Sequence, residues 1–200
     1  MKRGSLIVFE GLDGSGKSTQ LPRLARRLAA GGREVVATKE PHDCAPGRKI
    51  RELATRREPV PAAEELALFV EQRRIHVREL IAPGLARGAI VLSDRYFLST
   101  VAYQGARGLD PARLLAESEA EFPLPDLALL LVLPPEAGLA RVAARGGVAE
   151  PAFERADFLA RVSEIFDALD RPYLVRIDAA GSPGAVEARI AEAVKRLALG

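Results

Sequence analysis

Hydrophobic residues recur along the chain in two alternating patterns. Short apolar runs rich in β-branched residues predict strands at 5–10, 34–38, 89–93, 127–133 and 172–177. Longer stretches between them carry apolar residues three or four positions apart, which predicts helices at 110–121, 135–144, 154–169 and 183–197. Strand and helix alternate, as they do in a parallel sheet covered by helices on both faces.

Two further helices are predicted from their apolar stripes. The first follows residue 16 and carries Leu21, Leu24, Ala25 and Leu28 on one side, and the second runs from "PVPAAEE" to the neighbourhood of "PG" at 83–84. The runs "AIVLS" and "ALLLVL" are almost continuously apolar, which is typical of central strands. We therefore expect an α/β fold with a five-stranded parallel sheet, in one domain that covers residues 1–200.

Composition and charge exclude several classes of protein. A chain of 200 residues, 48% of them hydrophobic, suits one domain with a sizeable core. The formal net charge is only +2, so we expect no nucleic-acid partner, and no apolar run is long enough to predict a membrane partner. Cys44 is the only cysteine, which excludes an intrachain disulfide and favours a cytoplasmic location.

The stretch "GLDGSGKST" after the first predicted strand fits the pattern G-x-x-x-x-G-K-[ST]. Glycines allow successive backbone N–H groups to turn inward around an anion, and the helix that follows adds its positive N-terminus. Lys17 can reach the β- and γ-phosphates of a nucleotide, and the Ser18 hydroxyl is a ligand for Mg²⁺. The expected ATP-binding loop consists of Gly11, Leu12, Asp13, Gly14, Ser15, Gly16, Lys17, Ser18 and Thr19.

A phosphate-binding loop alone is compatible with GTPase switches, motors and small-molecule kinases. A GTPase reads guanine with an Asn-Lys-x-Asp element, and this chain contains no asparagine. A motor usually needs a second domain, for which 200 residues leave little room. Small-molecule kinases remain, and these must also hold an acceptor.

A second polar cluster, "VLSDRYFLSTVAYQG" at 91–105, begins where a central strand is expected to end. Ligands bind at that edge of a parallel sheet. Asp94 can assist Mg²⁺ through a water molecule, and Arg95 can hold a phosphate bidentately. Phe69 and Arg73 lie four positions apart on one predicted helix face, where an aromatic ring and a guanidinium can stack on a base and read its carbonyl group.

These motifs resemble the thymidylate kinases, which belong to the P-loop NTPase fold and transfer the γ-phosphoryl group of ATP to dTMP, giving dTDP. The resemblance is carried by "FEGLDGSGKST", by "DRYFLSTVAYQG", by "ALFVEQRRIHV" and by "PDLALLLVLPPEAGLARVAARG", so it covers most of the chain. The second of these is the specific one, because other small kinases share only the phosphate loop. The resemblance also implies Mg²⁺ as cofactor and a homodimer.

The resemblance further implies a set of site residues. Phe69 would stack on thymine, Arg73 would hydrogen-bond its edge, and Arg95 would hold the acceptor phosphate. Asp13 would face the deoxyribose or that phosphate. The expected substrate-binding residues are Glu40, Phe69, Arg73, Arg95, Ser99, Tyr103 and Gln104, with Ser18 and Asp94 at the metal. The expected catalytic residues are Lys17, Asp13, Arg95 and Arg145.

The chain departs from the family pattern in two places. "KEPHDC" at 39–44 stands where the family usually has R-E-P-G-G-T, and Val132 stands where the family often has aspartate. Gly14 also lacks the arginine that some members carry in the phosphate loop, which indicates that a small helical lid at about 141–156 supplies the charge. Arg141 is then expected at ATP and Arg145 at the transferred group, with Arg155 as a further candidate.

Two other functions remain open from the sequence. A deoxynucleoside kinase would use a carboxylate base after the first or second strand to activate an uncharged 5′-hydroxyl. A nucleotide-binding module that regulates a partner without turnover is favoured only by the altered segment "KEPHDC".

Overall fold

The structure is a computed structural model that describes residues 3–55, 60–144 and 156–197. Its sheet consists of the strands β1 (Ser5–Glu10), β2 (Val35–Lys39), β3 (Ile90–Asp94), β4 (Leu127–Val132) and β5 (Leu174–Asp178). They are arranged in the order β2-β3-β1-β4-β5, and every neighbouring pair is parallel. The predicted α/β class is confirmed, and the observed strand bounds differ from the predicted ones by at most two residues.

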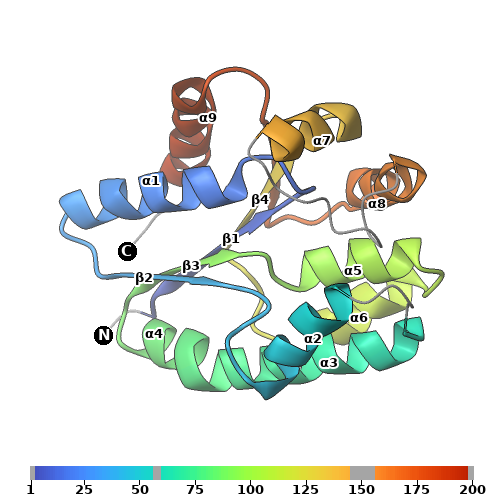
Figure 1. Cartoon of the computed structure of the whole chain (residues 1–200). Coiled ribbons are helices and arrows are strands. Elements are labelled where there is room, and N and C mark those ends of the chain that lie inside the picture. Colours follow the sequence, from blue (N-terminus) through green and yellow to red (C-terminus); the bar gives the residue numbers. More distant parts are fainter. Residues whose placement is uncertain (1–2, 56–59, 145–155, 198–200) are drawn as a thin grey trace.

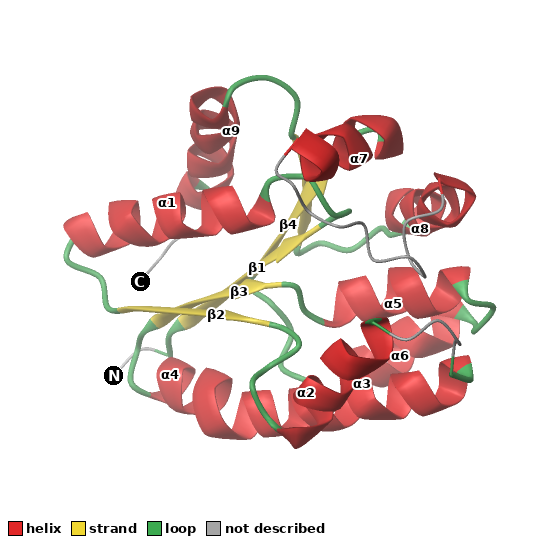
Figure 2. Cartoon of the chain, viewed as in Figure 1, coloured by secondary structure: helices red, strands yellow, loops and turns green. Residues whose placement is uncertain are grey.

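Helices cover both faces of this sheet (Figure 1). One face packs against α1 (Lys17–Ala30) and α9 (Pro183–Lys195), with α7 (Pro135–Ala144) at its edge. The other face packs against α4 (Ala82–Ala86), α5 (Phe97–Ala106), α6 (Pro111–Glu121) and α8 (Ala156–Ala168). Outside these, α2 (Ala45–Ala54) lies against α3 (Ala62–His76) (Figure 2).

The alternation of side chains in β1 explains why there are two cores. Leu6 and Val8 belong to the cluster beneath α5 and α8, whereas Ile7 and Phe9 belong to the cluster beneath α1 and α9. All four side chains are fully buried. Successive residues of a strand point to opposite faces, so a central strand covered on both sides must be apolar throughout.

The predicted helix that ends near Pro83 is interrupted. After His76 the chain forms one π-helical turn, Val77–Ile81, and then α4. Pro83 has no backbone N–H group and its ring crowds the preceding turn, and a widened turn accommodates it. Two helices, α2 and α5, were not predicted. Most of the side chains of α5 are buried, so its sequence "FLSTVAYQGA" lacks a polar stripe that would reveal a helical period.

The parallel arrangement gathers the polar strand ends at one edge. Phe9 in β1 and Lys39 in β2 are both in register with Asp94 in β3, so three strands end side by side. The loops that follow them carry the predicted phosphate and acceptor sites. Among the described residues, no helix has both the length and the apolar composition needed to cross a membrane.

Most of the predicted lid lies outside the described residues, and Arg145 and Arg155 are among the residues left out. Residues 141–144 form the last turn of α7, and residue 156 begins α8.

Candidate active site

The loop between β1 and α1 has the backbone of a phosphate-binding cradle. Gly11, Gly14 and Gly16 have positive φ angles of 129°, 80° and 107°. A Cβ atom at Gly14 would lie 2.2 Å from the carbonyl oxygen of Gly138 in α7, so a side chain there would force the loop and α7 apart. Glycine at this position therefore allows the loop to pack directly against the helix that leads into the predicted lid.

Lys17 is buried in this loop. Its Nζ donates to the carbonyl oxygens of Gly11 and Leu12, both at 2.9 Å, and lies 3.9 Å from the carboxylate of Asp13. Burial, followed by the nearby Arg95 guanidinium, lowers the pKa of Lys17 to about 8. The loop therefore holds its ammonium group across the space where phosphates would bind.

The structure brings the side chains of Ser18 and Asp94 together. The Ser18 hydroxyl donates to a carboxylate oxygen of Asp94 at 2.9 Å. Among the described residues, no group of three or more His, Cys, Asp or Glu side chains could by itself hold a metal ion. Mg²⁺ needs only one or two protein oxygens when phosphates and water complete its coordination, so a hydroxyl beside a carboxylate fits that ion.

A cavity beside the loop brings the predicted acceptor residues together. Its charged lining includes Asp13, Glu40, Arg73 and Arg95, and its other predicted members are Phe69, Ser99, Tyr103 and Gln104. These side chains come from the phosphate loop, the end of β2, α3 and the segment after β3. A second hollow, lined by Lys17, Ser18, Asp94 and Arg95 among others, adjoins the loop.

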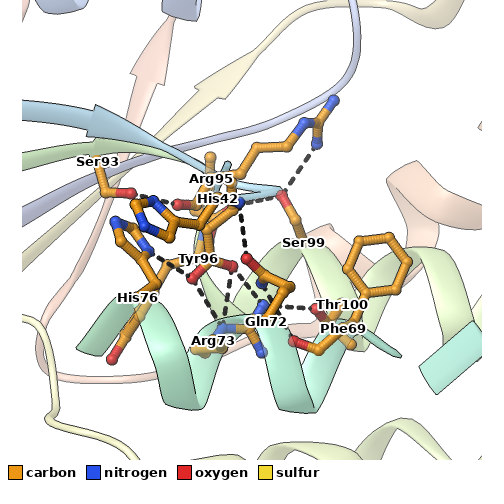
Figure 3. Close-up of polar contacts among 12 residues, drawn as sticks. His42, Phe69, Gln72, Arg73, His76, Ser93, Arg95, Tyr96, Ser99 and Thr100 are labelled. Carbon is orange, nitrogen blue, oxygen red and sulfur yellow. Dashed lines mark hydrogen bonds and ion pairs between the residues drawn. The ribbon is translucent and has the colours of Figure 1, made fainter. Parts of the chain in front are cut away.

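Glu40 and Arg73 form a fully buried ion pair (Figure 3). Arg73 donates through Nε and Nη2 to Glu40 Oε2, at 3.0 and 2.6 Å, and Nη2 also donates to the Thr100 hydroxyl at 2.8 Å. His76 Nδ1 lies 3.1 Å from Glu40 Oε1. Burial acts to raise the pKa of Glu40, but Arg73 and His76 outweigh it and hold that pKa below its usual value. The guanidinium is thereby fixed in one orientation.

Gln104, one helical turn after Thr100 in α5, is fixed in a similar way. Its amide nitrogen donates to Glu65 at 2.5 Å, and Arg107 binds the same carboxylate oxygen. A carboxylate only accepts hydrogen bonds, so it sets which end of the amide faces it. Among the described residues, Gln104 Oε1 and Arg73 Nη1 are buried atoms without a hydrogen-bond partner. The wall of the cavity therefore contains one acceptor and one donor that no other described group pairs.

Arg95 connects the cavity with the phosphate loop. Its Nη2 donates to Asp13 at 2.5 Å, its Nη1 donates to the Ser99 hydroxyl at 3.0 Å, and its guanidinium lies 5.0 Å from the centre of the Tyr103 ring. The positive charge of Arg95 therefore lies between the two hollows, where it can bind a phosphate group that passes from a nucleotide in one hollow to an acceptor in the other.

The segment that departs from the family pattern keeps this arrangement. In "KEPHDC", His42 stacks on His76 with ring centroids 4.6 Å apart, and its backbone N–H donates to Gln72 of α3 at 2.8 Å. Burial, and then the neighbouring His76, lowers the pKa of His42. Lys39 is exposed at the end of β2 and lines the hollow beside the phosphate loop. The altered loop is thus anchored to α3 beside the Glu40 pair.

Several residues of the site were missed from the sequence. Arg51 in α2 and Glu65 in α3 line the cavity, and the only signal for either is a charge on a helix. His76 lies three positions after Arg73, on the same helix face, which is a signal that the spacing offered. Glu10 ends an otherwise apolar strand, and a lone carboxylate at that position is the clearest sign that was overlooked.

Arg141, expected at ATP, lies in the last turn of α7 and donates to the carbonyl oxygen of Ala179 at 3.1 Å. Ala179 follows β5, so Arg141 connects the base of the predicted lid with the loop after that strand. Val132, at the end of β4, is partly exposed and offers no ligand to a metal.

Comparison with known proteins assigns the family. The family model described as thymidylate kinase matches residues 9–190. The thymidylate kinase of Desulfotalea psychrophila is 47% identical over 194 residues, which cover 97% of this chain and 96% of that protein. The thymidylate kinase of Akkermansia muciniphila is 44% identical, over 96% of this chain and 92% of the relative. That of Xanthomonas euvesicatoria is 49% identical, over 92% and 80%. The chain therefore belongs to the thymidylate kinase family.

Proposed function

We propose that this chain, as a single catalytic domain, transfers the γ-phosphoryl group of ATP to dTMP and so supplies dTDP for dTTP synthesis. The observation that carries the choice of acceptor is the pair of polar atoms in the cavity wall that lack a hydrogen-bond partner, the Arg73 Nη1 donor and the Gln104 Oε1 acceptor. Thymine offers a carbonyl oxygen at C4 and an N–H at N3, which match this pair. Cytosine offers an amino group and a bare ring nitrogen, which mismatch it at both positions.

The phosphates of ATP would bind to the inward-facing N–H groups of the loop and to Lys17. Ser18 and Asp94 would hold Mg²⁺, directly or through water. When bound, the ion neutralises charge on the phosphates of ATP. Arg95 would leave Asp13 to bind the acceptor phosphate, because a phosphate dianion is a stronger partner for a guanidinium than one carboxylate.

The transfer itself requires little covalent work from the protein. Lys17 and Arg95 approach the moving phosphoryl group from the donor and acceptor sides and reduce the repulsion between the two nucleotides. Asp13 would hold the acceptor from the loop. From the predicted lid, Arg145 would complete the charge, while Arg141 would bind ATP. We further propose that the protein is a homodimer and is cytoplasmic. Sedimentation of the purified protein would test the dimer.

The decisive experiment measures kcat/KM with ATP and Mg²⁺ for dTMP, dUMP and dCMP. We expect dUMP to be a weaker but real substrate, since one methyl group is worth ~1–3 kcal/mol, and dCMP to fall by a factor on the order of a thousand or more. Equal values for dTMP and dCMP would refute this reading of the base.

A variant sharpens the same experiment. Glu65→Gln removes the carboxylate that orients the Gln104 amide, so the amide can turn and dCMP should gain activity relative to dTMP. Glu119→Gln, in a carboxylate that binds Arg171 and Tyr173 away from the cavity, is the matched control and should leave the ratio unchanged.

Neither alternative function is favoured by the geometry. A deoxynucleoside kinase needs an available carboxylate base after β1 or β2. After β2, both oxygens of Glu40 are bound by Arg73 and His76, and after β1 the Asp13 carboxylate accepts from Arg95. A regulatory module was suggested only by "KEPHDC", and that segment is anchored beside the intact Glu40 pair. Thymidine in place of dTMP tests the first alternative, and turnover of ATP excludes the second.

A further inference from the structure

Glu10 is a fully buried carboxylate that neither the nucleotide loop nor the base pocket uses directly. It is the last residue of β1 and immediately precedes Gly11. Both of its oxygens accept hydrogen bonds from one segment after β3. Oε1 accepts from the backbone N–H of Tyr96 at 3.0 Å, and Oε2 accepts from the Ser99 hydroxyl. Glu10 therefore ties the end of one central strand to the segment that follows its neighbour.

That segment contains an unusual backbone. Arg95 has a φ of 71°, and it is the one non-glycine residue with a positive φ in the part of the chain that the structure describes. Such a conformation is costly for a residue with a Cβ atom and persists only where its surroundings enforce it. Here Arg95 N donates to the carbonyl oxygen of Phe9 at 2.9 Å, and the Ser93 hydroxyl donates to Arg95 O at 2.7 Å. Glu10 fixes the next peptide group through Tyr96.

The side chain of Arg95 is held by the same carboxylate through one intermediate. Arg95 Nη1 donates to Ser99 Oγ at 3.0 Å (Figure 3), and the Ser99 hydroxyl donates to Glu10. An ionised carboxylate only accepts and a guanidinium only donates, so the single hydroxyl proton of Ser99 has one possible direction. The chain of hydrogen bonds thus runs from Arg95 through Ser99 to Glu10.

We propose that Glu10 is a positioning residue for the acceptor phosphate, which it never touches. It aims the Arg95 guanidinium through Ser99 and fixes the left-handed turn of Arg95 through the Tyr96 peptide group. Ser99, expected at the nucleoside, serves in this relay instead. The proposal rests on the function proposed above, because it assigns Arg95 to the phosphate of dTMP.

The chemistry of the Glu10 carboxylate favours a functional reason for a glutamate, and not a glutamine, at this buried position. Burial raises the pKa of Glu10 to about 7, although the Ser99 hydrogen bond and the Arg95 charge act to lower it. A neutral glutamine has the same shape and would avoid the cost of burying a charge. Glutamine has only one acceptor atom, however, so it cannot accept from Tyr96 and Ser99 through separate oxygens.

The test compares two ligands that differ only in the phosphate. Calorimetric dissociation constants for dTMP and thymidine define the gain in affinity that the phosphate provides. In Glu10→Gln we expect that gain to fall by about tenfold, the range of a misdirected charge-assisted hydrogen bond, while thymidine binding stays within about twofold. A purely structural role would weaken both ligands together and would overturn the proposal, as would an unchanged ratio.

Glu65→Gln is the matched control, since it alters a buried carboxylate on the base side of the same cavity. It should weaken dTMP and thymidine equally and leave the phosphate gain intact. If the intact protein binds dTMP no better than thymidine, the proposed function fails, and this result is distinct from the failure of the Glu10 proposal.

A double-mutant cycle provides a second readout. In an Arg95→Ala background, Glu10→Gln should no longer change the dTMP-to-thymidine ratio, because the group it aims is gone. An equal loss with and without Arg95 would show that Glu10 acts by another route. Thermal unfolding of each variant checks that the fold is kept.

Discussion

The donor and acceptor halves of the site consist of different chemical groups. On the donor side the described residues offer backbone N–H groups, glycines at positive φ and a lysine held by carbonyl oxygens of its own loop. On the acceptor side the cavity is walled by side chains paired with one another, chiefly Glu40 with Arg73 and Glu65 with Gln104. The donor loop has one shape for any triphosphate, whereas the acceptor wall is specific to a particular base edge.

This difference determines what each half should lose on mutation. Backbone groups cannot be deleted by substitution, so changes in the loop affect the added cation or the space between elements. Buried ion pairs, by contrast, leave an unpaired charge when one partner is removed. Acceptor variants should therefore lose stability as well as selectivity, and donor variants should lose mainly turnover.

The largest effect on stability is expected for Arg73→Ala. Removal of the guanidinium leaves Glu40 buried without its main partner, which typically costs about 3–5 kcal/mol in the free energy of unfolding. Urea denaturation measures this loss. Arg74→Ala, in the adjacent and exposed arginine, is the control and should change stability little. Equal losses in the two variants would show that the acceptor wall is not held by the buried pair.

Lys17→Ala should show the opposite behaviour. We expect a fall in kcat on the order of a hundredfold or more, because one preorganised charge on the transferred group is lost. Stability should hold, since no buried anion depends on Lys17 alone. Stopped assays at saturating ATP and dTMP measure the turnover, with exposed Lys49→Ala as control. Normal turnover in Lys17→Ala would remove the phosphate loop from the mechanism.

The pH dependence of stability separates Glu10 from the other acceptor groups. Its pKa is about 7 in the folded protein, against 4.5 for an ordinary glutamate in water, so the folded state binds the proton more tightly than the unfolded chain does. The contribution of Glu10 to stability is therefore fully present below pH 4.5 and is lost as pH rises to about 7 and above, by about 3 kcal/mol.

Glu10→Gln should lack this loss. The difference in unfolding free energy between the two proteins should shift in favour of the variant across the same pH interval, when followed by denaturant titration. The charged groups that act on Glu10 are Arg95, Arg73 and Glu40. A pH-independent difference would mean that Glu10 is not buried as a titrating acid.

Gly14→Ala tests the contact between the phosphate loop and α7. Alanine at φ 80° costs about 1–3 kcal/mol in strain, and its Cβ would also press on Gly138 of α7. Gly32→Ala is a close control, because φ there is 78° and an added Cβ meets no atom within 4 Å. The difference between the two variants in unfolding free energy isolates the contact with α7. No difference would show that the loop and α7 yield freely.

The same comparison explains what could be predicted from the sequence. The donor loop is local: its glycines, lysine and serine are consecutive, and a strand and a helix frame them, so both its position and its chemistry were predicted. The acceptor cavity was predicted only where a motif or helical spacing linked its members, as for Phe69 with Arg73. Glu65 acts through long-range pairing with Gln104, which no local pattern predicts. The helical spacing from Arg73 indicated the position of His76, but not its pairing with Glu40 from another element.

Helix prediction failed for a related reason. A helical period is visible only when one face is polar, and α5 is buried on nearly all sides between the sheet, α6 and α8. The π-helical turn before Pro83 widens the helix so that the proline ring fits. The stripe of apolar residues does not reveal this widening. The pattern of hydrophobic residues thus predicted the layers of the fold. The structure was needed to show how the buried residues and helices pair with one another.

One consequence of the topology is that the residues that select the acceptor are close together in the sequence and could be transferred between related proteins. Apart from Asp13, every residue that lines the cavity lies between Glu40 and Gln104. This continuous stretch of chain starts at the end of β2 and contributes only one strand, β3, to the sheet. The triphosphate loop precedes this stretch, and the base of the lid follows it. A single recombination cassette spanning that stretch would therefore carry the base-reading side chains into a related scaffold together with Asp94 and Arg95, while the glycine loop, Asp13 and Lys17 remained those of the host.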